Sequence, residues 1–238
     1  MKYFFISLIT LLCYSNLAFA QYSELLHKPY PEQIEILSDL YAGANMGEIL
    51  SLPAMEETVA GMRELGIKEN DQNLVMEADL FEAFYKVYNQ IEGIEALIRV
   101  QKESEKKGFL YIASRAANAI AVVYWENMEF EKSIHWHLIL DELISDMTIA
   151  EFPDKAFFLQ AIGSDFRFFG DYEKAISYFK RVVDLPIDDF YIYPYRHSLN
   201  NLGHSYRELG KIDSSDFAFR RLTPIRHLSN GLVLLQEI

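Results

Sequence analysis

The chain contains a sequence repeat with a period of forty residues near its C-terminus. In order, the first copy contains Ile162, Gly163, Phe166, Gly170, Tyr172, Ala175 and Phe179. With the same spacing, the second copy contains Leu202, Gly203, Tyr206, Gly210, Ile212, Ser215 and Phe219. A fixed period of roughly 20 to 50 residues is typical of stacked supersecondary units. The sequence therefore predicts a repeat protein, a class that binds other chains along an extended surface.

Weaker copies precede this pair. The copy that lies forty-two residues upstream of the first contains Ala121, Tyr124, Met128, Phe130, Ser133, His137 and Leu140. A still weaker copy, thirty-seven residues earlier again, contains Phe84, Val87, Ile91 and Ala96. The segment from Pro31 to Gly66 would supply an N-terminal pair of helices. We therefore expect four to five helical hairpins.

The pattern of apolar residues indicates α-helices along the whole chain after its first twenty residues. Apolar side chains recur at steps of three and four, which is the helical period. Pro31 and Pro53 stand where a proline can begin a helix. The aromatic stretch from Phe190 to Tyr195 is short and contains a proline, so we expect a loop there. Asp213 to Asp216 is expected to cap a helix at its N-terminus. The predicted fold class is all-α.

The repeated positions resemble the tetratricopeptide repeat. Its signature is a small residue and an aromatic residue on the first helix, a glycine in the turn, and an aromatic–alanine–aromatic pattern on the second helix. Leu159 to Pro186 is the most complete copy, and Leu199 to Phe219 is the next. The resemblance covers residues 70–222 and implies an α-solenoid of stacked helical hairpins that forms a right-handed superhelix. The period exceeds the usual 34 residues by about six, and we assign the excess to loops between repeats.

The glycines of the repeat have physical explanations. Gly163 and Gly203 would allow the two helices of a hairpin to approach closely, because glycine has no Cβ. Gly170 and Gly210 would end the first helix of each hairpin in the left-handed conformation.

The first twenty residues have the pattern of a secretory signal peptide. Lys2 is their only charge, an apolar run from Tyr3 to Cys13 follows, and Ala18 to Ala20 form a small-x-small cleavage site. An uncleaved membrane anchor is the alternative, but the apolar run is shorter than the roughly 20 residues that span a bilayer. We therefore expect an exported protein that is periplasmic or extracellular after cleavage.

The remaining sequence divides into a degenerate hairpin, four repeats and a tail. Residues 21–69 would form the hairpin. The expected repeats occupy about 70–107, 111–145, 153–186 and 194–222. Residues 223–238 form a tail or the start of a further helix. The tail is apolar, and it would fold back, mediate a homodimer or continue into a longer parent protein.

The charge of the chain restricts its partners. It contains 35 acidic and 22 basic residues, which gives a net charge of −13. Nucleic acid is a poor partner, because phosphate binding relies on clustered lysine and arginine. No second apolar stretch would span a membrane in the mature chain, and Cys13 is the only cysteine. The expected partner is another protein or a peptide.

The first helix of each hairpin would line the concave groove of a superhelix. The candidate groove residues are Arg115, Asn118, Val122 and Trp125, then Phe157, Gln160, Ser164 and Arg167, then His197, Asn200, His204 and Arg207. Amides can pair with an extended peptide backbone, and arginines suit carboxylates. The hypothesis is a groove for an extended or C-terminal peptide. The alternative is that these side chains are solvated and bind nothing.

No catalytic or metal-binding pattern is recognisable. His135 and His137 are two residues apart on a predicted helix, so they would face different directions. We expect no catalytic residue, no metal and no cofactor. The favoured function is an exported protein–protein interaction scaffold. The alternative is a sensory ectodomain of a bacterial signal-transduction regulator, and an enzyme is the third class.

Overall fold

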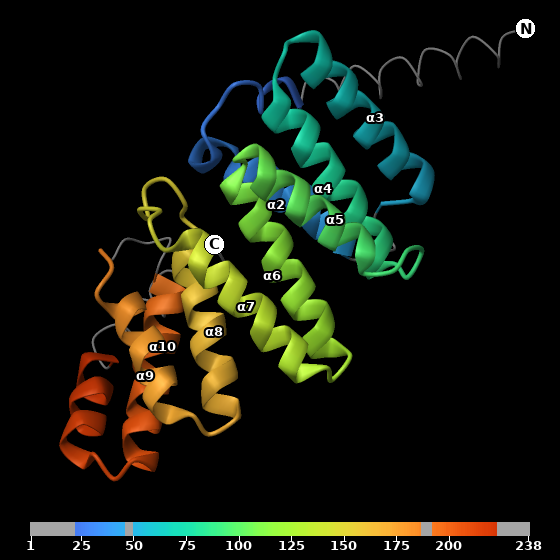
Figure 1. Ribbon diagram of the computed structural model, residues 1–238. Coiled ribbons are helices and arrows are strands. Elements are labelled where there is room, and N and C mark those ends of the chain that lie inside the picture. The colour runs from blue at the N-terminus through green and yellow to red at the C-terminus, as the bar shows by residue number, and fades with distance from the viewer. Residues whose placement is uncertain (1–21, 46–49, 187–191, 223–238) are drawn as a thin grey trace, which may run out of the picture. The chain divides into compact units, whose positions relative to one another are not determined.

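The computed structural model describes residues 22–45, 50–186 and 192–222, and every regular element in these ranges is an α-helix (Figure 1). The predicted signal peptide, the C-terminal tail and part of the loop between Pro186 and Pro194 lie outside the described residues. The chain divides into an N-terminal unit, residues 1–146, and a C-terminal unit, residues 147–238. None of the described helices is long and apolar enough to cross a membrane.

The N-terminal unit contains six labelled helices and the C-terminal unit three, within the described residues. The first six are α2 (Tyr30–Asn45), α3 (Leu52–Lys68), α4 (Gln72–Tyr88), α5 (Glu95–Lys107), α6 (Leu110–Glu126) and α7 (Phe130–Ile144). The C-terminal unit has α8 (Lys155–Phe168), α9 (Tyr172–Val183) and α10 (Ile192–Glu208), followed by a helix over residues 212–222. The hairpins are α4 with α5, α6 with α7, α8 with α9, and α10 with the helix 212–222.

The turns within the hairpins share one backbone geometry. After α8, Gly170 has a φ of 77°, its N–H donates to Arg167 O, and the next N–H donates to Phe166 O. Gly210 has a φ of 70° and ends α10 in the same way. These paired bonds satisfy carbonyls that the helix end leaves free. The expected left-handed role of the two glycines is confirmed.

The same turn defines the repeat in the N-terminal unit, where a glycine is absent from it. Met128 has a φ of 61° and Gln90 a φ of 57°, and both make the paired bonds back to the preceding helix. Met128 is the residue that the sequence aligned with Gly170. The predicted alignment of α4, however, is wrong by one residue, because Gln90 and not Ile91 occupies the turn. Counting back from Gln90 puts the buried Ala83, not Phe84, at the small-residue position.

The two glycines at the helix crossings are required by close packing. A Cβ on Gly163 would lie 2.7 Å from the ring of Phe179, which is fully buried. A Cβ on Gly203 would lie 2.5 Å from the ring of Phe219. Both distances are too short for carbon atoms that are not bonded. The glycines therefore allow the second helix to place an aromatic ring directly on the first.

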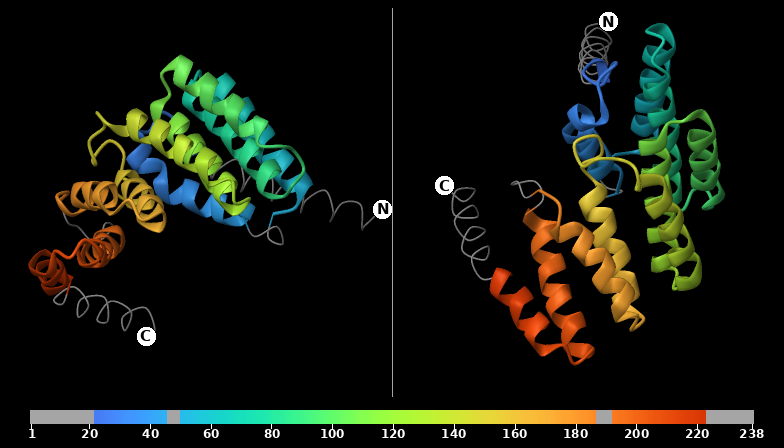
Figure 2. Two further views of the ribbon diagram at one scale, coloured as in Figure 1. Left: turned by 60° about the horizontal axis from the view of Figure 1, so that its bottom comes forward. Right: turned by 60° about the vertical axis from the view of Figure 1, so that its left-hand side comes forward.

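The first two helices do not form the hairpin that we expected for residues 21–69. α3 packs against α4, and α2 also packs against α4 (Figure 2). The apolar face of α2 ends in Tyr41, whose ring meets Phe81 and Phe84 of α4 edge to face, at centroid distances of 5.3 and 5.0 Å. These aromatic contacts with α4 determine where α2 lies.

Two local predictions in the C-terminal unit are also corrected. α10 begins at Ile192, so most of the expected loop from Phe190 to Tyr195 is helical where it is described. Pro194 lies in the first turn, where a helix does not use the backbone N–H that proline lacks. The last described helix begins at residue 212, so Asp213 to Asp216 lie inside its first turns. Ser215 is buried and donates to the carbonyl of Gly203 at 2.8 Å.

Candidate functional site

The candidate groove residues lie on the first helices of the hairpins. We call the surface formed by α4 and α6 the N-terminal face, and the surface formed by α8 and α10 the C-terminal face. Arg115, Asn118 and Trp125 belong to the N-terminal face, and the other candidates belong to the C-terminal face. The two faces differ in what covers them, so each is described by itself.

An ion pair between the two helices lies at the centre of the N-terminal face. Arg115 Nη1 of α6 donates to Glu77 Oε2 of α4 at 2.6 Å, and only 12% of the Arg115 side chain and 4% of the Glu77 side chain are exposed. Burial alone would lower the pKa of Arg115, but the attraction of Glu77 holds that pKa well above its usual value. Arg115 is therefore charged, and Glu77 accepts its hydrogen bond.

Two tyrosines of α2 complete this cluster. The Tyr41 hydroxyl donates to Glu77 Oε1 at 2.8 Å, and the Arg115 guanidinium lies 4.6 Å from the centroid of the Tyr41 ring and 5.4 Å from that of Tyr30. Burial and, next, the charge of Glu77 raise the pKa of Tyr41 well above its ordinary value. The hydroxyl is therefore protonated and able to donate.

Further contacts hold the segment around α2 on this face. The rings of Tyr30 and Tyr111 stack with centroids 5.2 Å apart. Asp71 caps the start of α4 by accepting from two backbone N–H groups, and its second oxygen accepts from the N–H of His27 at 2.6 Å. The N-terminal face is thus occupied by a helix of the same chain.

The predicted groove residues of the N-terminal face consequently have structural partners or are only partly exposed. Arg115 is closed off by Glu77 and the tyrosines, so it does not line an open groove. Asn118 is half-buried. Trp125 is also half-buried, and its ring packs edge to face on Phe130 at 5.0 Å.

The C-terminal face has an aromatic region near the beginning of its helices. The rings of Phe157 of α8 and Tyr193 of α10 stack with centroids 6.2 Å apart, and Tyr193 also lies 4.2 Å from the ring of His197. Half of Tyr193 is exposed. Partial burial and, less strongly, Arg196 lower the pKa of His197, so its ring is neutral at neutral pH. This region presents ring surface to solvent.

A basic region lies toward the ends of the same helices. Partial burial lowers the pKa of His204, the charges of Arg167 and Arg207 lower it further, and the charge of Glu208 opposes them, so all three charged side chains lie near His204. The Arg167 Nε is buried, and within the described residues no atom accepts a hydrogen bond from it. Arg207 is exposed, with its guanidinium 5.3 Å from the ring of Phe219. The structure therefore brings together the three basic residues that the sequence predicted for this face.

Amides lie between the aromatic and basic regions. Gln160 and Asn200 are half-buried at equivalent positions of α8 and α10. The Gln160 amide donates to Ser164 Oγ at 2.9 Å, and that hydroxyl donates to the Gln160 carbonyl. The face thus contains ring surface, amides and arginines in sequence along two helices.

Sequence reasoning missed Tyr30, Tyr41, Glu77 and Tyr193 as members of these faces. Tyr193 could have been found, because it follows Tyr111 by the same 82 residues that separate the turn residues Met128 and Gly210. Glu77 could have been noticed as an acidic residue inside an apolar helical run. The contacts of α2 had no comparable signal, since they join segments far apart in sequence.

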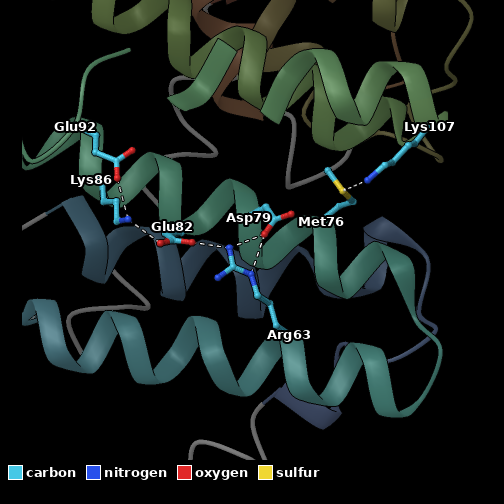
Figure 3. A network of polar contacts seen from close by, with 7 residues as sticks. All are labelled: Arg63, Met76, Asp79, Glu82, Lys86, Glu92 and Lys107. Carbon is cyan, nitrogen blue, oxygen red and sulfur yellow. Dashed lines mark hydrogen bonds and ion pairs between the residues drawn. The ribbon is translucent and has the colours of Figure 1, made fainter. Parts of the chain in front are cut away.

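The surface of α4 next to α3 and α5 carries a chain of ion pairs, shown in Figure 3. Arg63 binds Asp79 at 2.6 Å and Glu82 at 2.5 Å, and Lys86 binds Glu82 at 2.7 Å and Glu92 at 3.0 Å.

The corresponding side of α10 is apolar. Counted from the turns, the residues of α10 that correspond to Asp79, Glu82 and Lys86 are Leu199, Leu202 and Tyr206. There they form the floor of a cleft of about 530 Å³ between α9 and the helix 212–222. The two units therefore differ on this side as well.

Comparison with known proteins identifies the repeat. The family model described as tetratricopeptide repeat matches residues 158–186 and 197–223. The C-terminal unit therefore contains two tetratricopeptide repeats. Both matched segments belong to the C-terminal unit and coincide with its two hairpins. No curated protein matches the sequence of the chain.

Solved structures with the same fold extend over most of the chain. BtubC (BKLC) from P. vanneervenii aligns with a TM-score of 0.63 at 14% identity, covering 92% of this chain and 91% of that one. A putative kinesin light chain from Podosopora anserina with TPR-like repeats aligns with a TM-score of 0.53 at 13% identity, covering 82% and 96%. The predicted fold class, an all-α solenoid of helical repeats, is confirmed.

Proposed function

We propose that this tetratricopeptide-repeat protein is an exported interaction module that binds a peptide or protein segment on its C-terminal face. Tetratricopeptide repeats are typical of protein–protein interaction and are usually not catalytic. The N-terminal residues support export, because they have the charge, apolar and cleavage-site pattern of a signal peptide. The proposal assigns binding to the C-terminal unit and a structural role to the N-terminal face.

The single observation that carries the proposal is the contrast between Arg115 and Arg167. Arg115 is paired with a buried carboxylate, whereas the buried Nε of Arg167 has no acceptor among the described residues. A buried donor without an acceptor costs free energy, and the half-buried Arg167 side chain would recover it by turning outward to a carboxylate of a partner. Arg207 adds a second positive charge near His204. The face therefore suits a segment with acidic side chains.

The test is charge reversal on the C-terminal face. The double variant Arg167→Glu and Arg207→Glu should lose the proteins that the wild-type chain retains in a pull-down from its own compartment. The matched control is Lys180→Glu with Arg220→Glu, which reverses two exposed charges on the second helices. Both variants should keep the helical circular dichroism of the wild type. Equal retention by the two variants would contradict the proposal.

A further inference from the structure

The cleft between α9 and the helix 212–222 corresponds to a place that a side chain fills in the preceding hairpin. Both hairpins belong to the C-terminal unit, and their turn residues Gly170 and Gly210 are forty residues apart. Each position of the second hairpin therefore has a counterpart forty residues earlier. Three pairs of counterparts concern the cleft: Tyr178 and Ala218, Phe166 and Tyr206, and Arg181 and Arg221.

In the first of these hairpins, aromatic rings and cations pack on one another. The rings of Phe166 and Tyr178 stack with centroids 5.6 Å apart and an angle of 12° between their planes. The Arg181 guanidinium lies 5.2 Å from the centroid of the Tyr178 ring, and Lys174 Nζ lies 5.0 Å from that of Phe166. The buried Tyr178 ring therefore gains both stacking and cation–π attraction.

The second hairpin lacks this ring, because the buried Ala218 takes the place of Tyr178. The counterparts of the two neighbours of the ring, Tyr206 and Arg221, both line the cleft of about 530 Å³. The buried Leu199 and Leu202 form its floor. Pockets for small molecules typically have volumes of roughly 300–1,000 Å³. The cleft thus contains the two partners of a ring and enough space to hold one.

Arg221 is held at the cleft by a neutral partner. Its Nη2 donates to the hydroxyl of the buried Tyr195 at 2.7 Å, and its guanidinium lies 5.7 Å from the centroid of that ring. The ring of Phe217, which also lines the cleft, lies 6.0 Å from the same guanidinium. A hydroxyl fixes the guanidinium without neutralising its charge, so Arg221 can attract the face of a further ring.

The charges of the cleft do not favour an ionic ligand. Its lining includes two basic residues, Lys180 and Arg221, and two acidic residues, Asp184 and Asp213, so their formal charges cancel. A phenol is neutral at pH 7, and its hydroxyl can donate to a carboxylate. The side chain that fills the equivalent place, Tyr178, is itself a phenol.

We infer that the cleft between α9 and the helix 212–222 binds a neutral phenolic small molecule. The ring of the ligand lies against Tyr206 and Arg221, as the Tyr178 ring lies against Phe166 and Arg181. No candidate groove residue lines this cleft. The inference therefore goes beyond the proposed function and does not depend on it.

The probe for this inference is p-cresol, which is the side chain of tyrosine as a free molecule. Its binding to the full chain is measured by a chemical-shift titration, and we expect saturable shifts. The saturated analogue 4-methylcyclohexanol has a similar size but no π face, so it should bind about threefold or more weakly. Ala218→Tyr should weaken p-cresol binding about tenfold or more, because the new side chain occupies the place of the ligand.

A matched pair of variants assigns the effect to the cleft. Arg221→Gln should weaken p-cresol binding about threefold or more, because it removes the cation beside the ring. Arg181→Gln is the same substitution at the counterpart position, where Tyr178 already fills the place, and it should leave the affinity unchanged. Circular dichroism shows whether each variant retains its helices, and the arginine pair suffices for the test if Ala218→Tyr does not fold.

Three results would overturn the inference. The first is the absence of saturable p-cresol binding to the wild type. The second is equal affinity of p-cresol for the wild type and for folded Arg221→Gln. The third is binding of a blocked peptide with a central tyrosine, dependent on Arg221, without binding of p-cresol, which would assign the cleft to a side chain of another protein.

Discussion

The two faces of this protein contain related helices but opposite arrangements of charge. On the N-terminal face, Arg115 is paired with Glu77 and covered by two tyrosines of α2. On the C-terminal face, Arg167 and Arg207 both lie near His204, and the buried Nε of Arg167 has no acceptor in the described part of the chain. The same repeat can therefore serve as a closed structural unit or as an open surface, depending on whether the chain supplies the occupant itself.

The largest expected effect concerns the buried ion pair. Glu77→Ala leaves the Arg115 charge buried without a partner and should destabilise the N-terminal unit by about 3–5 kcal/mol. Arg167→Ala removes a charge whose Nε has no acceptor among the described residues, and it should cost less than about 1 kcal/mol. Urea unfolding followed by circular dichroism measures both. Similar losses of stability for Glu77→Ala and Arg167→Ala would show that the two faces do not differ in the way described.

A second comparison concerns the helix crossings of the C-terminal unit. Gly163→Ala should destabilise by about 1–3 kcal/mol, because the new methyl group would overlap the fully buried ring of Phe179. Gly203→Ala should cost less, since Phe219 is partly exposed and can move.

The control for these glycines lies in α3. A Cβ on Gly61 would meet its nearest neighbour at 3.8 Å, so Gly61→Ala should stabilise by up to about 1 kcal/mol through helix propensity. Thermal unfolding of the three variants ranks them. If Gly61→Ala destabilised the protein as much as Gly163→Ala, the close approach of the helices at Gly163 would not explain the loss of stability.

Substitutions in the hairpin turns should change stability by smaller amounts, and with opposite signs in the two units. Met128 adopts a φ of 61°, which strains a residue with a side chain, so Met128→Gly should raise stability by about 0.5–1 kcal/mol. Gly170→Ala introduces the same strain and should lower stability by about 1 kcal/mol. Differential scanning calorimetry measures both changes, and shifts of the same sign would argue against the shared turn geometry.

The smallest expected effect is the pH dependence of the ion pairs on α4. Partial burial would raise the pKa of Glu82, but hydrogen bonds and charge from Lys86 and Arg63 hold it below its ordinary value. The stabilisation is therefore complete above the unfolded-state pKa of about 4.3 and is lost as the pH falls through the lower folded-state value.

Glu82→Gln should abolish this part of the acid sensitivity at a cost of less than about 1 kcal/mol at neutral pH. The free energy of unfolding of both proteins, measured between about pH 7 and pH 3, tests it. Parallel curves for the wild type and the variant would show that Glu82 does not contribute.

The sequence predicted those features of the fold that repeat, because the same local chemistry recurs at a fixed period. Gly170 and Gly210 revealed their turns, and the C-terminal face followed from counting along α8 and α10. The sequence placed the turn after α4 one residue too late. Gln90 adopts the left-handed conformation there, and glutamine is not a residue type that indicates such a turn. The segment between α4 and α5, residues 89–94, is also three residues longer than that between α6 and α7, residues 127–129.

The closed state of the N-terminal face could not be predicted from the repeat. Arg115 stood at a position that the repeat pattern placed in the groove, together with Phe157 and His197. Its partner Glu77 is 38 residues away, and the tyrosines that cover it belong to α2, which lies outside the repeat pattern. Arg115 is therefore covered because α2, a segment outside the repeat, packs on it from far away in the sequence.

The central claim is that α2 covers the N-terminal face, while no other described helix covers the equivalent positions of the C-terminal face. Thiol labelling tests this claim at Phe84 and His204, which are equivalent and lie 120 residues apart. Each is replaced by cysteine in a chain that carries Cys13→Ser. The account predicts that Phe84→Cys reacts at least about tenfold more slowly than His204→Cys, because its labelling requires local opening of α2. Equal rates in folded protein would contradict it.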